Sequence, residues 1–134
     1  MSQNWTGSQW NPRLSLFRGR KIYEPPRYMS IPQAVSQLVE IESLRQSGIL
    51  VPEETLAISL SRVGGDESQQ KIVSGTLAEL VAQPTDVFGE PLHSLVIVGR
   101  KLHHLEVAYA EQYAVNATNW RKVARDVYKC ALDE

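Results

Sequence analysis

The Pro25-Pro26 pair limits the conformations open to the N-terminal part of this chain more than any other feature. Proline fixes φ and pushes the residue before it out of the helical region, so the chain around this pair is expected to be extended. Ser30 then stands as an N-cap, and apolar residues recur at spacings of three and four. This pattern predicts an amphipathic helix over residues 31–47, which Gly48 ends. The apolar positions are Ala34, Val35, Leu38, Val39, Ile41 and Leu44.

Downstream of this helix, predicted strands and helices alternate, which indicates an α/β or α+β fold. Thr76 and Thr118 are the expected N-caps of two helices. The longest apolar run, residues 95–98, is expected to be a buried strand. The predicted strands are residues 55–63, 71–75 and 92–99, and the predicted helices begin at residues 76, about 102, and 118.

Composition narrows the class of protein. A chain of 134 residues with 43% hydrophobic and 22% charged residues fits one domain with a real core. The formal net charge of −1 shows no basic excess for nucleic acid. No apolar run approaches the roughly 18 residues of a membrane helix, and no signal pattern opens the chain. The single cysteine, Cys130, cannot form an intramolecular disulfide, so a reducing, cytoplasmic location and no membrane partner are expected.

The first candidate for a functional segment is residues 20–29. It interleaves the cations Arg20, Lys21 and Arg27 with aromatic residues, a pattern also found where RNA bases stack between phosphate contacts. The alternative is a rigid crossover whose tyrosines pack on the following helix. Three cations can contact only a few phosphates, so no nucleic-acid partner is expected.

A second candidate is the strand end at residues 61–66, Ser-Arg-Val-Gly-Gly-Asp. Glycine lets a backbone approach a nucleotide closely, so such a strand end can hold a cofactor. The same residue types also form ordinary turns. The complete Gly-x-Gly-x-x-Gly fingerprint does not occur in the chain, and both interpretations stay open.

A third candidate is His93, which follows a Gly-Glu-Pro turn at the start of a predicted strand. Its position suits a general base, a ligand or a structural side chain. His103 and His104 are adjacent, and neighbouring helical residues point about 100° apart, so they cannot chelate one metal from a single face. No metal site is expected, and no motif indicates a catalytic residue.

Two segments carry a family resemblance: residues 19–30, Gly-Arg-Lys-Ile-Tyr-Glu-Pro-Pro-Arg-Tyr-Met-Ser, and residues 89–99, Gly-Glu-Pro-Leu-His-Ser-Leu-Val-Ile-Val-Gly. They resemble the C-terminal half of the diphthine synthase (diphthine methyl ester synthase) family of S-adenosylmethionine-dependent methyltransferases. The resemblance is strong over residues 19–106, and residues 107–134 are similar to a variable helical tail. It implies an α/β fold, the C-terminal αβα domain of a two-domain, tetrapyrrole-methylase-like enzyme without its N-terminal domain. Residues 1–18 match nothing in the family and are expected to be an unrelated, disordered leader.

The resemblance also implies roles for two residues. The position of Val63 contacts S-adenosylmethionine through its backbone, and that of His93 lines the adenosine pocket. Such enzymes are homodimers that transfer methyl groups to a modified histidine of translation elongation factor two, in diphthamide synthesis.

The absence of a first domain leads to two expectations. Half a cleft keeps few cofactor contacts, so cofactor binding by this chain is expected to be weak or absent, and the chain alone is expected to be inactive. The alternative function is a non-catalytic dimerisation or regulatory module that pairs with the full-length enzyme. The helix at residues 31–47 and the strand from Leu92 offer apolar faces for this, and an unpaired strand edge favours association.

Overall fold

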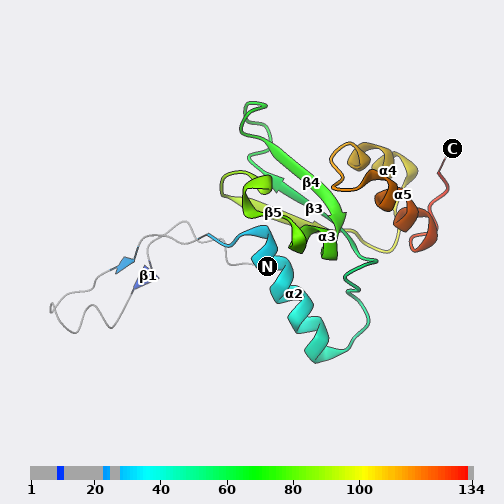
Figure 1. Ribbon diagram of the computed structural model, residues 1–134, viewed down its shortest axis with the longest axis horizontal. Coiled ribbons are helices and arrows are strands. Elements are labelled where there is room, and N and C mark those ends of the chain that lie inside the picture. The colour runs from blue at the N-terminus through cyan, green and yellow to red at the C-terminus, as the bar shows by residue number, and fades with distance from the viewer. Residues whose placement is uncertain (1–8, 11–22, 25–27, 133–134) are drawn as a thin grey trace.

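A three-stranded antiparallel sheet with helices on both faces forms the centre of the molecule (Figure 1). The computed structural model describes residues 9–10, 23–24 and 28–132. Within the expected leader only β1 (Gln9–Trp10) is described, and it pairs with β2 (Tyr23–Glu24). The other residues of the expected leader, and most of the cationic segment at residues 20–29, lie outside the described residues.

The first long helix, α2 (Ile31–Arg45), begins where the sequence predicts. Ser30 is its N-cap, since the Gln33 amide donates to Ser30 Oγ over 3.3 Å. The helix ends two residues earlier than predicted, because Gln46 rather than Gly48 is the C-cap and adopts the left-handed conformation, with φ of 51°. The Glu42 carboxylate accepts hydrogen bonds from the Ser47 hydroxyl and the Gly48 amide, both over 2.6 Å. The hydrogen bond from Ser47 contributes most to lowering the Glu42 pKa, so this acidic residue holds the helix end.

The sheet has the order β4–β3–β5. Its strands are β3 (Leu56–Ser61), β4 (Lys71–Thr76) and β5 (His93–Ile97), close to the three predicted strands. The prediction that residues 95–98 are buried is wrong, because Val96 is 45% exposed. Among the described residues β5 pairs only with β3, at the end of the strand order.

One face of the sheet is covered by α2, by α3 (Leu77–Ala82) and by the 3₁₀ turn η1 (Thr85–Phe88). Thr76 is the N-cap of α3, as predicted. The buried apolar residues on this face are Ile31, Val35, Ala57, Val73, Leu77, Leu80 and Phe88.

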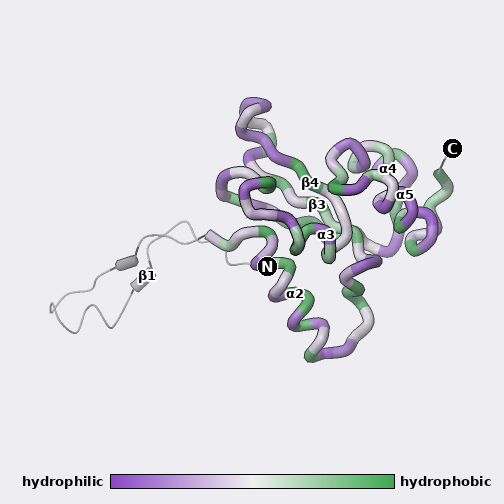
Figure 2. Tube along the Cα trace, viewed as in Figure 1, coloured by the Kyte–Doolittle hydropathy of each residue, from purple (hydrophilic) through white to green (hydrophobic). Residues whose placement is uncertain are grey.

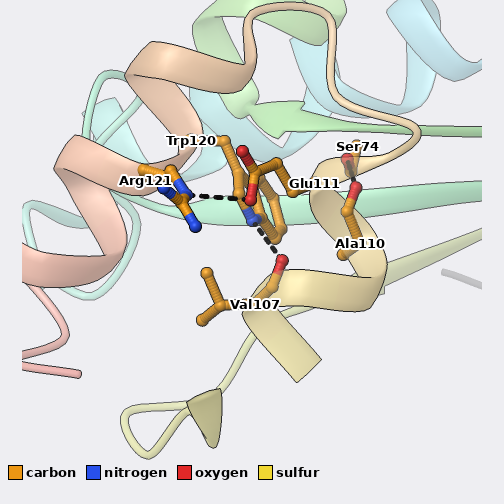
Figure 3. A network of polar contacts seen from close by, with 6 residues as sticks. All are labelled: Ser74, Val107, Ala110, Glu111, Trp120 and Arg121. Carbon is orange, nitrogen blue, oxygen red and sulfur yellow. Dashed lines mark hydrogen bonds and ion pairs between the residues drawn. The ribbon is translucent and has the colours of Figure 1, made fainter. Parts of the chain in front are cut away.

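The opposite face is covered by α4 (His104–Glu111) and α5 (Ala117–Asp126). Figure 3 shows how they are fixed: the Trp120 indole donates to the Val107 carbonyl over 3.1 Å, and the Ser74 hydroxyl donates to the Ala110 carbonyl over 2.6 Å. An ion pair between Arg121 and Glu111, at 2.9 Å, joins the two helices. The buried residues here are Leu56, Val107, Ala110, Trp120, Val123, Ala124 and Cys130.

The N-cap of α5 corrects one prediction. Asn116, not Thr118, caps this helix, since its Oδ1 accepts from the Asn119 amide over 3.1 Å. Both residue types cap helices well, and the extended backbone at Asn116, with φ of −138°, starts the helix two residues earlier. After α5 the chain turns back to the sheet, where the Leu56 amide donates to the Tyr128 hydroxyl over 3.0 Å.

Candidate functional site

The register of the sheet brings the two predicted site residues to one end of the molecule. Ser61, the last residue of β3, lies opposite His93, the first residue of β5. Val63 comes two residues after Ser61, in the turn that leads to β4. Ser61 and His93, 32 positions apart in the sequence, are therefore neighbours at this end of the sheet.

A loop before β5 is pinned to the end of β3. The Ser61 hydroxyl donates to the Glu90 carbonyl over 2.5 Å, and the Arg62 guanidinium donates to the Pro91 carbonyl over 2.9 Å. Gly89 has a φ of 76°, and a Cβ there would lie 2.7 Å from Cγ of Lys71, so only glycine fits. Sequence reasoning did not identify Ser61 and Arg62 as anchors, because their partners are 29 residues away and are backbone carbonyls.

His93 is 8% exposed. Burial lowers its pKa because the charged imidazolium loses hydration, and the nearby Glu90 carboxylate only partly opposes this. At neutral pH the ring is therefore uncharged, with one nitrogen that donates and one that accepts. An uncharged imidazole can form hydrogen bonds with polar atoms of a ligand, and it has no positive charge to attract an anion.

The strand end at residues 61–66 forms a tight turn. Arg62 and Gly64 have positive φ angles of 49° and 90°. The Gly65 amide donates to the Arg62 carbonyl, and the Gly64 amide donates to the Gln70 side chain over 2.9 Å. The whole connection between β3 and β4 is mostly hydrophilic (Figure 2). These residues thus form a turn, and their contact with a cofactor stays a prediction. Val63 is 59% exposed at the tip, open to any partner that approaches this end.

Two hollows share the pinned loop as a common wall. One, of about 270 Å³, lies against His93 and the residues before α2. The other, of about 350 Å³, lies against Arg62 and Lys71. Ligand pockets typically enclose roughly 300–1,000 Å³, so the first hollow is just below that range and the second is at its small end. Val63 lines neither hollow, so a ligand that touches both Val63 and His93 has to extend beyond them.

The other histidines have a structural role. His103 is the N-cap of α4: its Nδ1 accepts from the Leu105 amide over 3.2 Å, while its own amide donates to Glu106 over 2.8 Å. Its ring packs on that of His104, with centroids 4.2 Å apart. In the part of the chain that the structure describes, no three His, Cys, Asp or Glu side chains group as metal ligands do.

Within the same described residues, no helix has the length and apolar character needed to cross a membrane.

Comparison with known proteins relates this fold to one class of enzyme. The fold matches the crystal structure of a protein assigned as a diphthine synthase from Entamoeba histolytica, with a TM-score of 0.61 and 31% identity over 69% of this chain. A second diphthine synthase structure, at 24% identity and a TM-score of 0.53, shares the fold. Each match covers 34% of the solved chain, so the molecule corresponds to one mixed α/β domain of the diphthine synthase fold.

Curated sequences with high identity to this chain show which family it belongs to. Diphthine methyl ester synthase from Neurospora crassa is 46% identical over 114 residues, which is 85% of this chain and 38% of the relative. The enzymes named diphthine methyl ester synthase from Saccharomyces cerevisiae and Homo sapiens are 47% and 46% identical over 84% and 75% of this chain. No protein-family model matches the chain. The chain belongs to the diphthine methyl ester synthase family, as its two sequence segments predict, and spans a little over a third of the length of these relatives.

Proposed function

We propose that this chain forms the C-terminal, cofactor-contacting domain of an S-adenosylmethionine-dependent methyltransferase of diphthamide synthesis. Its substrate is translation elongation factor two, at the modified histidine. The chain works in the cytoplasm as part of a homodimer. The observation that carries this proposal is the 46% identity to diphthine methyl ester synthases over 85% of the chain. The site supports it, because Val63 and His93 come to the same end of the sheet.

The residues of this chain would bind and orient. S-adenosylmethionine supplies an electrophilic methyl group, so the protein contributes mainly position. The backbone at Val63 lies on an open turn where a ligand can reach it. The neutral His93 ring, held by the strand and backed by the pinned loop, would contact the adenosine portion. Because the two hollows are small, the rest of the cofactor would lie against another part of the enzyme.

Titration calorimetry of S-adenosylhomocysteine into the purified chain, with circular dichroism to confirm folding, tests the site. We expect weak binding, with a Kd on the order of 0.1–1 mM, since most contacts of a closed cleft are missing. His93→Ala should weaken it further. The matched control is His104→Ala, which removes an exposed ring outside the site. Equal effects of the two variants would contradict the role of His93, and no binding by a folded chain would mean that the cofactor needs the rest of the enzyme.

Transfer of labelled methyl groups to elongation factor two that carries the unmethylated intermediate tests activity. We expect no transfer by this chain alone. Transfer at a rate comparable to that of a full-length family member would show that the site is complete within this chain.

A second candidate function is a non-catalytic module that pairs with the full-length enzyme and regulates it. The observation that favours it is the exposure of apolar side chains on α2, where Ile41 is 48% and Leu44 is 79% exposed. Co-expression with a full-length relative, followed by a pull-down, tests this function. A complex that Leu44→Asp disrupts would support it, and the absence of any complex would contradict it.

A further inference from the structure

Arg62 lies between the two candidate cofactor contacts. In the sequence it directly precedes Val63. In space its guanidinium donates to the Pro91 carbonyl over 2.9 Å, and Pro91 comes two residues before His93. A single side chain therefore joins the turn after β3 to the loop before β5.

The backbone of Arg62 adopts a conformation that favours glycine. Its φ of 49° lies in the left-handed region, where a side chain is strained. Strained backbone of this kind occurs preferentially at functional sites, where surrounding contacts hold it in place. A glycine at position 62 would form the same turn without strain, but it would lack the contact with Pro91. The side chain is therefore what distinguishes Arg62 from a simple turn residue.

The loop before β5 is held differently at its two ends. At its start, Gly89 packs so closely on Lys71 that a Cβ would lie 2.7 Å from Cγ of that side chain. The buried Ser61 then donates to the next carbonyl over 2.5 Å. The end of the loop, toward β5, is held by the exposed guanidinium of Arg62. Loss of the Arg62 contact should therefore loosen the residues that lead to His93 and leave the start of the loop in place.

We infer that Arg62 is a positioning residue, which fixes the turn at Val63 and the ring of His93 relative to each other. This role deepens the proposed function and rests on it, because the relative position of the two residues affects the cofactor only if both contact it. Arg62 itself needs no contact with the cofactor. The consequence for binding is preorganisation, since a site whose parts are already in place loses less conformational freedom when its ligand binds.

Solution NMR of the full chain tests the anchor. Arg62→Gly removes the side chain and relieves the backbone, whereas Arg62→Gln removes the charge and shortens the side chain but keeps the strain. In both variants we expect changed chemical shifts for the His93 ring and an order parameter for the Leu92 amide that falls from about 0.85 to below about 0.6. The Glu90 amide, at the held start of the loop, should keep its order parameter. The urea midpoint of Arg62→Gly should change little, because an exposed hydrogen bond contributes little and glycine relieves the turn.

Lys129→Gly is the matched control. Lys129 is also an exposed cation with a positive φ, of 55°, and it lies beyond α5. In this variant the signals of Leu92 and His93 should match those of the original chain. Signals in both Arg62 variants that match the control would overturn the proposal. A change confined to one Arg62 variant would also overturn it, because the cause would then be the backbone at position 62 and not the contact with the loop.

Titration with S-adenosylmethionine, followed by NMR, tests the consequence for the site. Both Arg62 variants should weaken binding by about threefold to tenfold, since a mobile loop has to be ordered on binding, and Lys129→Gly should leave the affinity unchanged. An unchanged affinity in Arg62 variants whose loop is loosened would overturn the positioning role. No binding by any folded sample, the original chain included, would mean that the cofactor needs the rest of the enzyme. The order parameter of Leu92 and the His93 signals then decide the role of Arg62 by themselves.

Discussion

The helices on the two faces of the sheet are held by different kinds of contact. On the α4–α5 face, hydrogen bonds from Trp120 and Ser74 reach backbone carbonyls of α4, so the position of that helix is specified by polar contacts as well as by burial. On the other face, α2 buries Ile31 and Val35 in its first half and leaves Leu44 79% exposed in its second half. The difference teaches that α4 is held on its face by polar contacts as well as burial, whereas the second half of α2 extends beyond the apolar core of the other face.

The largest effect expected from this contrast is at Trp120. Trp120→Ala removes a fully buried side chain and its hydrogen bond, and should lower the free energy of unfolding by about 3–5 kcal/mol. Urea unfolding followed by circular dichroism measures it. Leu44→Ala on the other layer is the control and should change stability by less than about 0.5 kcal/mol. A large loss at Leu44 would show that the second half of α2 is packed in solution.

Ser74→Ala should have the next largest effect. Ser74 is fully buried, and its hydroxyl donates to the Ala110 carbonyl, which the variant leaves without that donor. We expect a loss of about 1–3 kcal/mol in the free energy of unfolding. An unchanged urea midpoint would mean that the hydroxyl does not help to hold α4 on the sheet.

Asn116→Ala sharpens the comparison at the start of α5. Loss of an N-cap costs about 1 kcal/mol, so this variant should be destabilised while Thr118→Ala should be nearly neutral. Thermal unfolding of the two variants side by side distinguishes them. If Thr118→Ala were the more destabilised variant, the helix would begin two residues later than described.

The smallest effect concerns pH and His93, on the same face as α2. Burial lowers the folded pKa of His93, so the unfolded state binds a proton more readily. Stability is therefore complete above the unfolded pKa of about 6.5 and decreases as the pH falls from there toward the folded pKa. His93→Gln should flatten this dependence in unfolding experiments between about pH 7.5 and 5.5. His104→Gln, at an exposed ring, should keep the slope of the original chain.

Local signals explain how much of the fold could be predicted. Ser30 and Thr76 cap helices as predicted, because capping depends on residues only three positions apart. The three strands were also predicted near their observed bounds. Two predictions were wrong because local signals do not decide them. The exposure of Val96 depends on which strand lies at the sheet edge, and the choice of Asn116 over Thr118 depends on how the chain enters α5.

The candidate site was predicted less completely. The sequence singled out His93 and Val63 but could not show that they lie at the same end of the sheet, because the Ser61–His93 register joins strands that are separated by β4, α3 and η1. It also missed the anchoring of the loop by Ser61 and Arg62, whose acceptors are backbone carbonyls and so leave no residue pattern. The Gly89-Glu90-Pro91 sequence predicted a loop but did not show which residues this loop contacts.

The hydrogen bond from the Leu56 amide to the Tyr128 hydroxyl protects one backbone proton of β3 for as long as the C-terminal segment stays on the sheet. The Tyr128 hydroxyl is the acceptor for this amide, and burial raises the pKa of the phenol, so it stays protonated at neutral pH. The exchange rate of that single proton with deuterium therefore reports how often residues after α5 leave the sheet. Measured beside the amide of Val98, which bonds within the sheet, it separates fraying of the tail from unfolding of the whole domain.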